Sequence, residues 1–321
     1  MKKTHIVSIG AAVQDVFLQG KIFKPKKEDD GELVEEFILG TKNDIEDVTY
    51  STGGGATNAS VTFARLGLNS WFMGCLGDDV AAEMVRHDLR KESVNTSLVW
   101  ESKDQGTGYS TLLLAPNGER TILTYRGASS DFSITDKKFK GVNPDWVYIS
   151  SLSGDIDALE AIVDYVKKRK IKIAINPGKG EIKQSARFKK LLGNFTILSL
   201  NKQELEMLFG TADLDTLLEK SNKQVEYVVV TDGPNGSYVV DRQNKYKSGM
   251  YKDVPVIDRT GAGDSFCSGF VAMIAEGESV EKAITYGSAN STSVVGKIGA
   301  KAGILTTDRG LDSMKIEITK L

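Results

Sequence analysis

The chain has 321 residues and a formal net charge of -2, and its residues are 40% hydrophobic and 26% charged. This composition is that of an ordinary globular protein, and the length suits one large domain with an appendage. The small net charge excludes the overall basic field that attracts nucleic acid or an anionic membrane surface, so we expect neither as a partner.

Cysteine and histidine are scarce, with two residues of each. Cys75 and Cys267 lie far apart in apolar stretches, which favours reduced thiols in a core and a reducing compartment. The shortage of histidine argues against His-based hydrolases and zinc sites. Because Ser8 and Gly10 interrupt the first apolar run, and no run approaches about 18 apolar residues, we expect a cytoplasmic protein with neither a signal peptide nor a membrane span.

Short β-branched runs alternate with longer stretches of helical periodicity along most of the chain. In chain order the pattern predicts strand His5–Val13, helix Ala56–Leu66, strand Trp71–Leu76, helix Ala81–Lys91, strand Trp146–Ser151, helix Ile156–Arg169, strands Ile171–Asn176 and Thr196–Leu200, helix Lys202–Phe209, strand Tyr227–Thr231 and helix Ala262–Glu276. Such alternation indicates βαβ units, and therefore an α/β fold in which helices cover both faces of a parallel sheet.

Two segments depart from this pattern. Residues 15–50 are charged and extended, and residues 107–126 resemble a hairpin with a turn at Pro116-Asn117-Gly118. Their strands alternate in polarity without intervening helices, so we expect a small separate sheet that forms a lid over a substrate cleft. The core would then comprise residues 1–14, 51–106 and 127–321.

The most informative segment runs from Asp258 to Phe270, where Gly261 and Gly263 adjoin the start of a predicted helix. Glycines let the backbone approach a ligand closely, and the first turn of a helix presents unpaired N–H groups to an anion. A carboxylate at a helix start is usually only a cap. Asp264, however, would lie beside a transferring phosphoryl group, where it could take a proton from a hydroxyl.

Two segments resemble the signatures of one family. Asp258-Arg-Thr-Gly-Ala-Gly-Asp264 is similar to the carboxy-terminal signature of the ribokinase-like (PfkB-type) sugar kinases, Asp-Thr-x-Gly-Ala-Gly-Asp, with Arg259 at a variable position. Gly53-Gly-Gly-Ala-Thr-Asn58 resembles the amino-terminal signature of that family. The resemblance implies a three-layer α/β/α core with a small β-sheet lid, and it implies substrate contacts from Asp15, Gly53, Gly54, Gly55 and Asn58.

The resemblance also implies a nucleotide site, with ATP and Mg²⁺ as cofactors. It assigns to the nucleotide Asn176, Asn201, Thr231, Gly233, Gly236 and Asn290. Glu204, in Asn201-Lys-Gln-Glu204, would belong to the magnesium network through water. Asp258 and Thr260 are the local candidates for binding K⁺. Because Asn290 and Gly299 are about two residues closer than in some relatives, the identity of K⁺ ligands stays open.

The expected reaction is transfer of the γ-phosphoryl group from ATP to a hydroxyl of a small sugar or nucleoside. The amides of Gly261, Ala262 and Gly263 would form the anion hole, and Asp264 would be the general base. The chain has no Gly-x4-Gly-Lys-Ser/Thr, so it is not a P-loop enzyme, and no Gly-x-Gly-x-x-Gly supports an NAD-linked dehydrogenase.

Three questions stay open at this level. Residues 52–58 contain no lysine, which favours an uncharged acceptor, but Arg126 and Lys42 keep a phosphosugar kinase of the fructose 6-phosphate or fructose 1-phosphate type as an alternative. A non-catalytic sugar or nucleotide sensor is a second alternative, although a pure binder has no use for a base. The alternating strands near residues 33–38 and 109–125 could also pair two copies into a homodimer through the lid.

Overall fold

The computed structural model describes residues 3–117, 119–132, 136–139, 141–210, 213–252, 254–307 and 314–321. These residues form a large sheet of ten strands in the order β16-β15-β14-β13-β12-β11-β10-β1-β6-β7. The parallel strands are β1 (His5–Ile9), β6 (Asn69–Leu76), β7 (Asn95–Glu101), β10 (Trp146–Ile149), β11 (Lys172–Ile175), β12 (Ile197–Asn201) and β13 (Tyr227–Thr231). The antiparallel strands at one edge are β14 (Ser237–Val240), β15 (Asn244–Ser248) and β16 (Ile316–Lys320).

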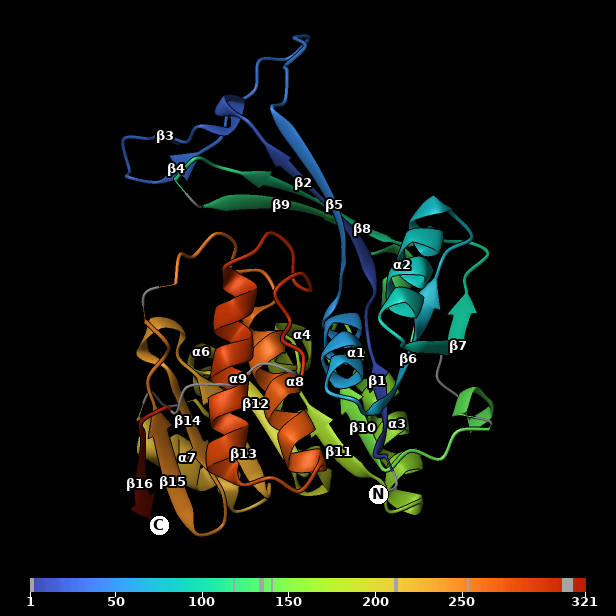
Figure 1. Ribbon diagram of the computed structural model, residues 1–321, viewed down its shortest axis with the longest axis vertical. Helices are drawn as coiled ribbons and strands as arrows, with labels where there is room; N and C mark the ends of the chain where they lie inside the picture. Colours follow the sequence, from blue (N-terminus) through green and yellow to red (C-terminus); the bar gives the residue numbers. More distant parts are fainter. Residues whose placement is uncertain are drawn as a thin grey trace.

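Helices cover both faces of this sheet, which confirms the predicted α/β class (Figure 1). Successive side chains of a strand point to opposite faces, so neighbouring residues of β1 enter two different cores. Ile6 packs on the side of α1 (Gly55–Arg65), α8 (Ala262–Ala275) and α9 (Val280–Val295). Val7 and Ile9 pack on the side of α3 (Ile156–Lys168), α5 (Ser185–Leu191), α6 (Lys202–Phe209) and α7 (Leu214–Asn222).

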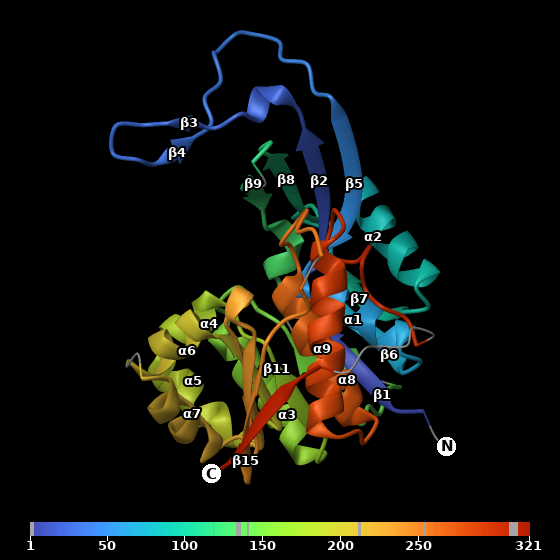
Figure 2. The same cartoon turned by 60° about the vertical axis from the view of Figure 1, so that its left-hand side comes forward.

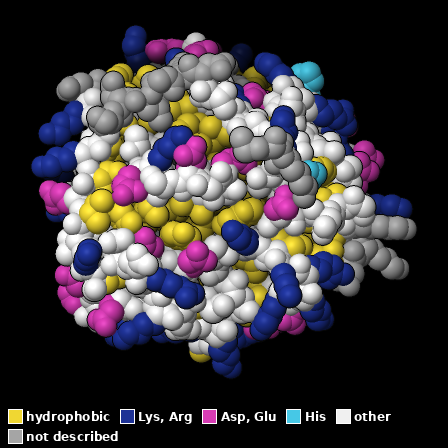
Figure 3. Space-filling model, turned by 60° about the horizontal axis from the view of Figure 1, so that its bottom comes forward, with side chains coloured by type: hydrophobic (Ala, Val, Ile, Leu, Met, Phe, Trp, Pro, Cys, Tyr) yellow, Lys and Arg dark blue, Asp and Glu magenta, His cyan; other side chains and the backbone are white. Residues whose placement is uncertain are grey.

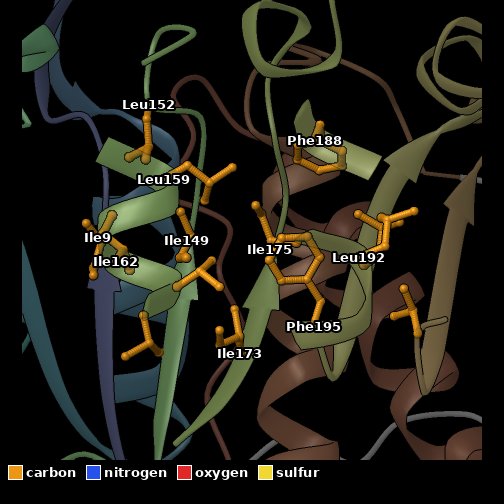
Figure 4. Close-up of a cluster of buried hydrophobic side chains, with 14 of the residues drawn as sticks. Ile9, Ile149, Leu152, Leu159, Ile162, Ile173, Ile175, Phe188, Leu192 and Phe195 are labelled. Atoms are coloured by element: carbon orange, nitrogen blue, oxygen red, sulfur yellow. The ribbon is translucent and has the colours of Figure 1, made fainter. Parts of the chain in front are cut away.

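The core on the side of α3, α5, α6 and α7 is the more extensive of the two. Ile9, Ile149 and Ile173 extend from neighbouring strands toward Leu159 and Ile162 of α3 (Figure 4). All five side chains are at most 1% exposed. At about 1.5–3 kcal/mol for each fully buried aliphatic side chain, this apolar contact is a main source of the stability that holds the strand ends in place.

A smaller sheet lies beyond one end of the large sheet (Figures 1 and 2). Strand β1 runs toward it, so it lies at the end where the parallel strands have their carboxyl ends. Among the described residues it has the strand order β5-β2-β8-β9. Its strands are β2 (Val13–Gln19), β5 (Asp47–Gly53), β8 (Gly108–Leu114) and β9 (Arg120–Tyr125), while the short strands β3 (Lys26–Lys27) and β4 (Leu33–Val34) form an arm beyond it. We refer to this four-stranded sheet as the lid.

The predicted strand His5–Val13 is wrong in its extent. Strand β1 ends at Ile9, and the chain turns at Gly10, where an added Cβ would lie 2.1 Å from Ser150 Oγ. A new strand, β2, then begins at Val13 and pairs only within the lid. Asp15, predicted as a substrate contact, lies within β2. The expected divisions at residues 14/15 and 50/51 fall inside β2 and β5.

The remaining surface carries charges of both signs. On the end of the core away from the lid, the described Lys and Arg side chains lie among Asp and Glu side chains around apolar areas (Figure 3). Within the described ranges, no helix combines the length and the apolar character that crossing a membrane requires. Helix α2 (Val80–Lys91) packs beside the base of the lid, and the short α4 (Lys179–Lys183) follows β11.

Candidate active site

The start of α8 is shaped for an anion. Gly261 precedes the helix with φ of 78°, and an added Cβ there would lie 2.5 Å from Ala300 Cβ, so the position requires glycine. No side chain caps this helix, and an added Cβ at Gly263 would meet no atom within 4 Å. Free space therefore adjoins the first turn at the positive end of the helix dipole, where Ala262 N makes only a long hydrogen bond of 3.4 Å to Arg259 O.

Asp264 lies in this first turn and is partly buried. Its Oδ2 accepts a hydrogen bond of 3.0 Å from Asn58 Nδ2, which comes from α1. Burial raises the pKa of Asp264 above its ordinary value, and the Asn58 hydrogen bond acts in the opposite direction. Burial thus strengthens this carboxylate as a base, while Asn58 fixes its orientation.

Residues of the predicted acceptor site lie next to this carboxylate. An added Cβ at Gly55, the first residue of α1, would lie 3.2 Å from Asp264 Oδ1, and one at Gly53 would lie 2.1 Å from Asp15 Oδ2. Gly54 has φ of 98°, and an added Cβ there would lie only 2.3 Å from Ala11 O. The three glycines therefore let α1 start directly between Asp15 and Asp264.

The acceptor site is buried and polar. Asp15 is 6% exposed, and the Oδ1 atom of Asn58 is buried without a hydrogen-bond partner among the described residues. Burial raises the pKa of Asp15 to about 6, even though the charge of Lys301 and the Ser110 hydroxyl both lower it. A buried acceptor atom without a partner costs free energy, so this geometry favours a ligand that donates hydrogen bonds here.

On the other side of the α8 start lies a cavity of about 350 Å³. Thr231, Gly233 and Gly236, predicted to bind the nucleotide, lie along one wall. The other walls are mostly apolar and come from the loop after β15 and from α8 and α9, with Met250, Val256, Phe266, Ser288, Ser291, Thr292 and Val295. An apolar cavity with a few hydroxyl groups is typical of a site for a planar base.

A second cavity, of about 230 Å³, adjoins the first. It is lined by Asn176, Asn201, Glu204 and Asp264, and it shares Thr231, Arg259, Ala262 and Gly263 with the larger cavity. The shared residues show that the two cavities form one cleft that passes over the start of α8. The structure thus brings the predicted nucleotide loop, the anion hole and the proposed base together.

Glu204, the predicted magnesium residue, forms a capping box with Asn201, a predicted nucleotide residue, at the start of α6. Asn201 N donates to Glu204 Oε2, and Glu204 N donates to Asn201 Oδ1, both at 2.9 Å. Burial raises the pKa of Glu204, with the Asn201 backbone hydrogen bond acting against it. The described residues contain no cluster of three His, Cys, Asp or Glu side chains suited to a metal. Isolated carboxylates in a phosphate-binding cleft do fit Mg²⁺, which keeps several waters and takes ligands from substrate phosphates.

Asn290 does not face the cleft. It is fully buried in α9, where Nδ2 donates to Ser265 O and Oδ1 accepts from Leu305 N, both at 2.9 Å. Its amide joins α9 to α8 and to the loop that follows, so it lacks the exposed surface that contact with a purine requires. Ser291 and Thr292, on the next positions of the same helix, line the cleft in its place.

Both side-chain oxygens of Asp258 likewise accept hydrogen bonds within the protein. Oδ1 accepts from Thr260 N at 2.9 Å and from Thr260 Oγ1 at 2.6 Å, and Oδ2 accepts from Gly299 N at 3.0 Å. This carboxylate holds the turn before α8 against the Gly299 loop, and Arg120 Nε of the lid lies 4.0 Å from it. Direct binding of K⁺ by Asp258 would have to displace these donors.

Two cations near the site had no role in the sequence-based interpretation. Arg259 was read as a variable position, yet it lines both parts of the cleft. Lys301 directly follows Gly299 and Ala300 and is 5% exposed. The sequence gives little signal for either residue, since Arg259 stands at a variable position of the signature and Lys301 follows Gly299 and Ala300. The surroundings of a side chain depend on segments that are distant along the chain.

Comparisons with known proteins agree with this geometry. Residues 4–307 match the model of the pfkB family carbohydrate kinases. A ribokinase from Haemophilus influenzae is 28% identical over 273 residues, which cover 82% of this chain and 87% of the relative. The fold is similar to that of Methanocaldococcus jannaschii nucleoside kinase, with a TM-score of 0.76, 23% identity, and coverage of 96% and 97% of the two chains. Arabidopsis thaliana ribokinase complexed with ribose and ATP also has a TM-score of 0.76, with 21% identity and coverage of 95% and 96%.

Proposed function

Because the chain belongs to the pfkB family of carbohydrate kinases, it is a phosphotransferase that acts on a hydroxyl group, and we propose that it transfers the γ-phosphoryl group of ATP to a small ribose-like sugar or a nucleoside. One observation carries this proposal: the start of α8 lies between a base-sized cavity and a buried polar site, and Asp264 lies next to Gly55 of the polar site and lines the smaller cavity that joins the two. The ATP in the Arabidopsis ribokinase complex and the ADP in that of Cryptococcus neoformans ribokinase support ATP as the donor.

The start of α8 supplies the anion hole. Amides of Gly261, Ala262 and Gly263 donate to the oxygens of the transferring group, where negative charge develops. Arg259 adds a positive charge to the same cleft. The donors are fixed by the helix before the reaction starts, so no reorganisation is required when charge develops.

Asp264 accepts the proton of the acceptor hydroxyl as that oxygen attacks phosphorus. Its raised pKa brings it nearer to the pH at which it must act, and Asn58 holds it in place. Bound Mg²⁺ would neutralise charge on the phosphates, with Glu204 holding it through water. K⁺ stays a prediction, with Thr260 as a candidate ligand and Asp258 as the residue that orders its turn.

The acceptor site suits an uncharged polyol. Asp15 and Asn58 offer hydrogen-bond acceptors, and the buried cation of this region, Lys301, donates to Thr52 and lies beside Asp88. Arg126 was one reason to consider a phosphosugar as the acceptor. Its Nη1 lies 3.5 Å from Ser153 Oγ at an exposed site. Lys42 is exposed on the loop beyond β4. Neither position provides a buried phosphate site, so the uncharged acceptor is favoured.

A coupled assay of ADP release tests this function. Ribose, adenosine, fructose and fructose 6-phosphate should be compared as acceptors, with and without K⁺, and in the presence and absence of Mg²⁺. We expect turnover with ribose or adenosine that requires Mg²⁺. Preference for fructose 6-phosphate would establish the phosphosugar alternative. Binding of ATP without transfer to any acceptor would favour a sensor.

We also propose a cytoplasmic homodimer. The lid exposes apolar side chains along its edge strands, with Val48, Tyr50, Ile122, Leu123 and Tyr125 each at least 41% exposed. Grouped apolar side chains of this kind typically mark a protein interface. A monomeric mass at micromolar concentration would contradict the dimer. The free, buried thiols of Cys75 and Cys267 support a reducing compartment.

A further inference from the structure

Glu181 is a buried carboxylate to which the proposed reaction gives no role. It belongs to the short helix α4 and is 1% exposed. It is not among the residues that line either part of the cleft. A carboxylate is costly to bury unless hydrogen bonds compensate for the water that it loses, so its donors indicate what it does.

Backbone amides converge on both oxygens of Glu181. Oε1 accepts from Leu152 N at 2.8 Å and from Gly154 N at 2.7 Å. Oε2 accepts from Gly178 N at 2.7 Å, and Ser151 Oγ lies 3.4 Å from it. The three amide distances are as short as those of hydrogen bonds to a charged acceptor. Converging amides of this kind form a hollow that suits an anion, and Glu181 fills it from within the chain.

The amides come from two different loops. Residues 151–154 follow β10 and residues 176–178 follow β11, which is its parallel neighbour in the sheet. The loops are in close contact, since an added Cβ at Gly180 would lie 2.7 Å from Gly154 Cα. Ser153 and Gly154 have φ of 57° and 87°, and the left-handed conformation costs free energy at a serine. The hydrogen bonds to Glu181 on both sides of Ser153 therefore hold the first loop in its shape and clamp it to the second.

Each loop adjoins a different side of the candidate active site. Ser150, directly before the first loop, borders the acceptor site, because an added Cβ at Gly55 would lie 3.0 Å from Ser150 Cβ and 3.2 Å from Asp264 Oδ1. Asn176 and Pro177, in the second loop, line the smaller cavity at the start of α8. Glu181 therefore joins a segment on the acceptor side to a segment that forms the wall of the phosphate side.

We propose that Glu181 is a positioning residue for phosphoryl transfer, which clamps the loops after β10 and β11 together and so fixes the phosphate side of the cleft against the acceptor side. The inference rests on the proposed function, because the register of the two sides matters for turnover only if a group passes between them. In-line transfer requires the attacking oxygen and the phosphorus to be aligned, and a misplacement of about 1 Å can cost about 10²-fold in rate. Loss of the clamp thus lowers kcat and leaves the separate binding of each substrate largely intact.

Two variants open the clamp from opposite sides. Glu181→Gln keeps the shape of the side chain, but in either orientation its NH₂ group faces a backbone N–H that now donates to the carboxylate. Gly180→Ala keeps the carboxylate and presses its Cβ against Gly154 Cα. The second variant carries the test if the first does not fold.

Each variant has a matched control. Glu92→Gln neutralises another largely buried carboxylate, one that pairs with Arg65 at 2.7 Å and lines neither part of the cleft. Gly193→Ala adds a Cβ that would meet no atom within 4 Å. Steady-state ADP release gives kcat and both KM values for each folded variant. Amide hydrogen exchange of residues 150–154 and 176–178 follows the two loops without any substrate.

We expect kcat to fall by about 10–100-fold in Glu181→Gln and Gly180→Ala, with both KM values within about threefold of native. Exchange of the two loops should become at least about tenfold faster in these variants. Both controls should keep native kcat and native exchange in these loops, even where Glu92→Gln lowers Tm. Native kcat in the two clamp variants would overturn the inference. If the native protein releases no ADP with any acceptor, the proposed function fails, and the exchange rates of the two loops still decide whether Glu181 clamps them.

Discussion

Replacement of Asp264 by asparagine isolates the proposed proton transfer from the rest of the site. The new side chain has nearly the same shape, and its carbonyl oxygen can still accept the hydrogen bond from Asn58 Nδ2. The larger cavity, at Thr231, Met250 and Val295, is lined without Asp264, so the walls proposed to hold the base are untouched. The change therefore removes the base and little else.

The expected loss lies in kcat. General-base catalysis contributes roughly 10²–10⁴-fold, and each factor of ten corresponds to about 1.36 kcal/mol of activation free energy. We therefore expect Asp264→Asn to raise the barrier by about 2.7–5.4 kcal/mol. KM for ATP should change less than about threefold, because the substitution leaves the walls of the larger cavity intact.

The thermal stability of Asp264→Asn should not fall along with its kcat. The folded-state pKa of Asp264 is raised, so its favourable contribution is complete below the unfolded value and is lost as the pH rises through the folded value. At neutral pH the native protein therefore bears the cost of a partly buried carboxylate, which asparagine removes. We expect the Tm of Asp264→Asn at pH 7 to be equal to or higher than that of the native protein.

The assay is single-turnover and steady-state ADP release with the preferred acceptor, together with thermal unfolding at pH 7. Asp164→Asn is the matched control, since Asp164 is exposed on α3, on the other face of the sheet. Near-native kcat in Asp264→Asn would remove this residue from the mechanism. A large fall in Tm would instead show that Asp264 mainly holds the start of α8.

Three further predictions concern the anion hole, the acceptor site and the base cavity. Gly261→Ala should lower kcat by about 10²–10³-fold, the typical effect of losing an anion-hole donor, because its Cβ would lie 2.5 Å from Ala300 Cβ. Gly277→Ala is the control, because Gly277 has a similar φ of 81° with open space around it. This variant should lose roughly 1–2 kcal/mol of stability and keep its kcat. Equal losses of kcat in the two variants would contradict the anion hole. Burial raises the pKa of Asp15 to about 6, so its carboxylate becomes protonated as the pH falls through 6. We therefore expect kcat/KM for the acceptor at pH 5 to be about tenfold below its plateau. A flat profile from pH 5 to 7 would exclude Asp15 from acceptor binding. Val295→Trp should fill the larger cavity and raise KM for ATP at least about tenfold, while the exposed Lys297→Trp should not, and unchanged KM in both would place the base elsewhere.

Local patterns in the sequence were sufficient for most of the core. Apolar β-branched runs predicted β6, β10, β11, β12 and β13, and helical periodicity predicted α1, α2, α3, α6 and α8 to within a few residues. These elements are buried on one or both faces, so their pattern is enforced by packing. Helix α9 was missed, because its sequence is rich in serine, threonine and glycine between residues 287 and 293 and carries little apolar periodicity.

Expectations about single side chains depended on context that the chain order does not reveal. Asn290 was assigned to the nucleotide by resemblance, but its amide bonds to the backbone of Ser265 and of Leu305, the latter fifteen residues further on. Asp258 was a candidate cation ligand, yet the N–H of Gly299 occupies its second oxygen. In both cases a polar side chain that could have served a ligand is satisfied by backbone groups instead.

The sequence alone determined the parts of this protein that depend on neighbours in the chain: the alternation of strand and helix, the glycine-rich start of α8 and the acid that follows it. Backbone conformation and periodicity are local properties, so one segment suffices to recognise them. Only the tertiary structure decided that β2 leaves the core for the lid, that Asn58 reaches Asp264, and that Lys301 bonds to Thr52 at the base of the lid. Burial and electrostatic interaction depend on distances between segments up to 249 residues apart, and these distances exist only once the chain is folded.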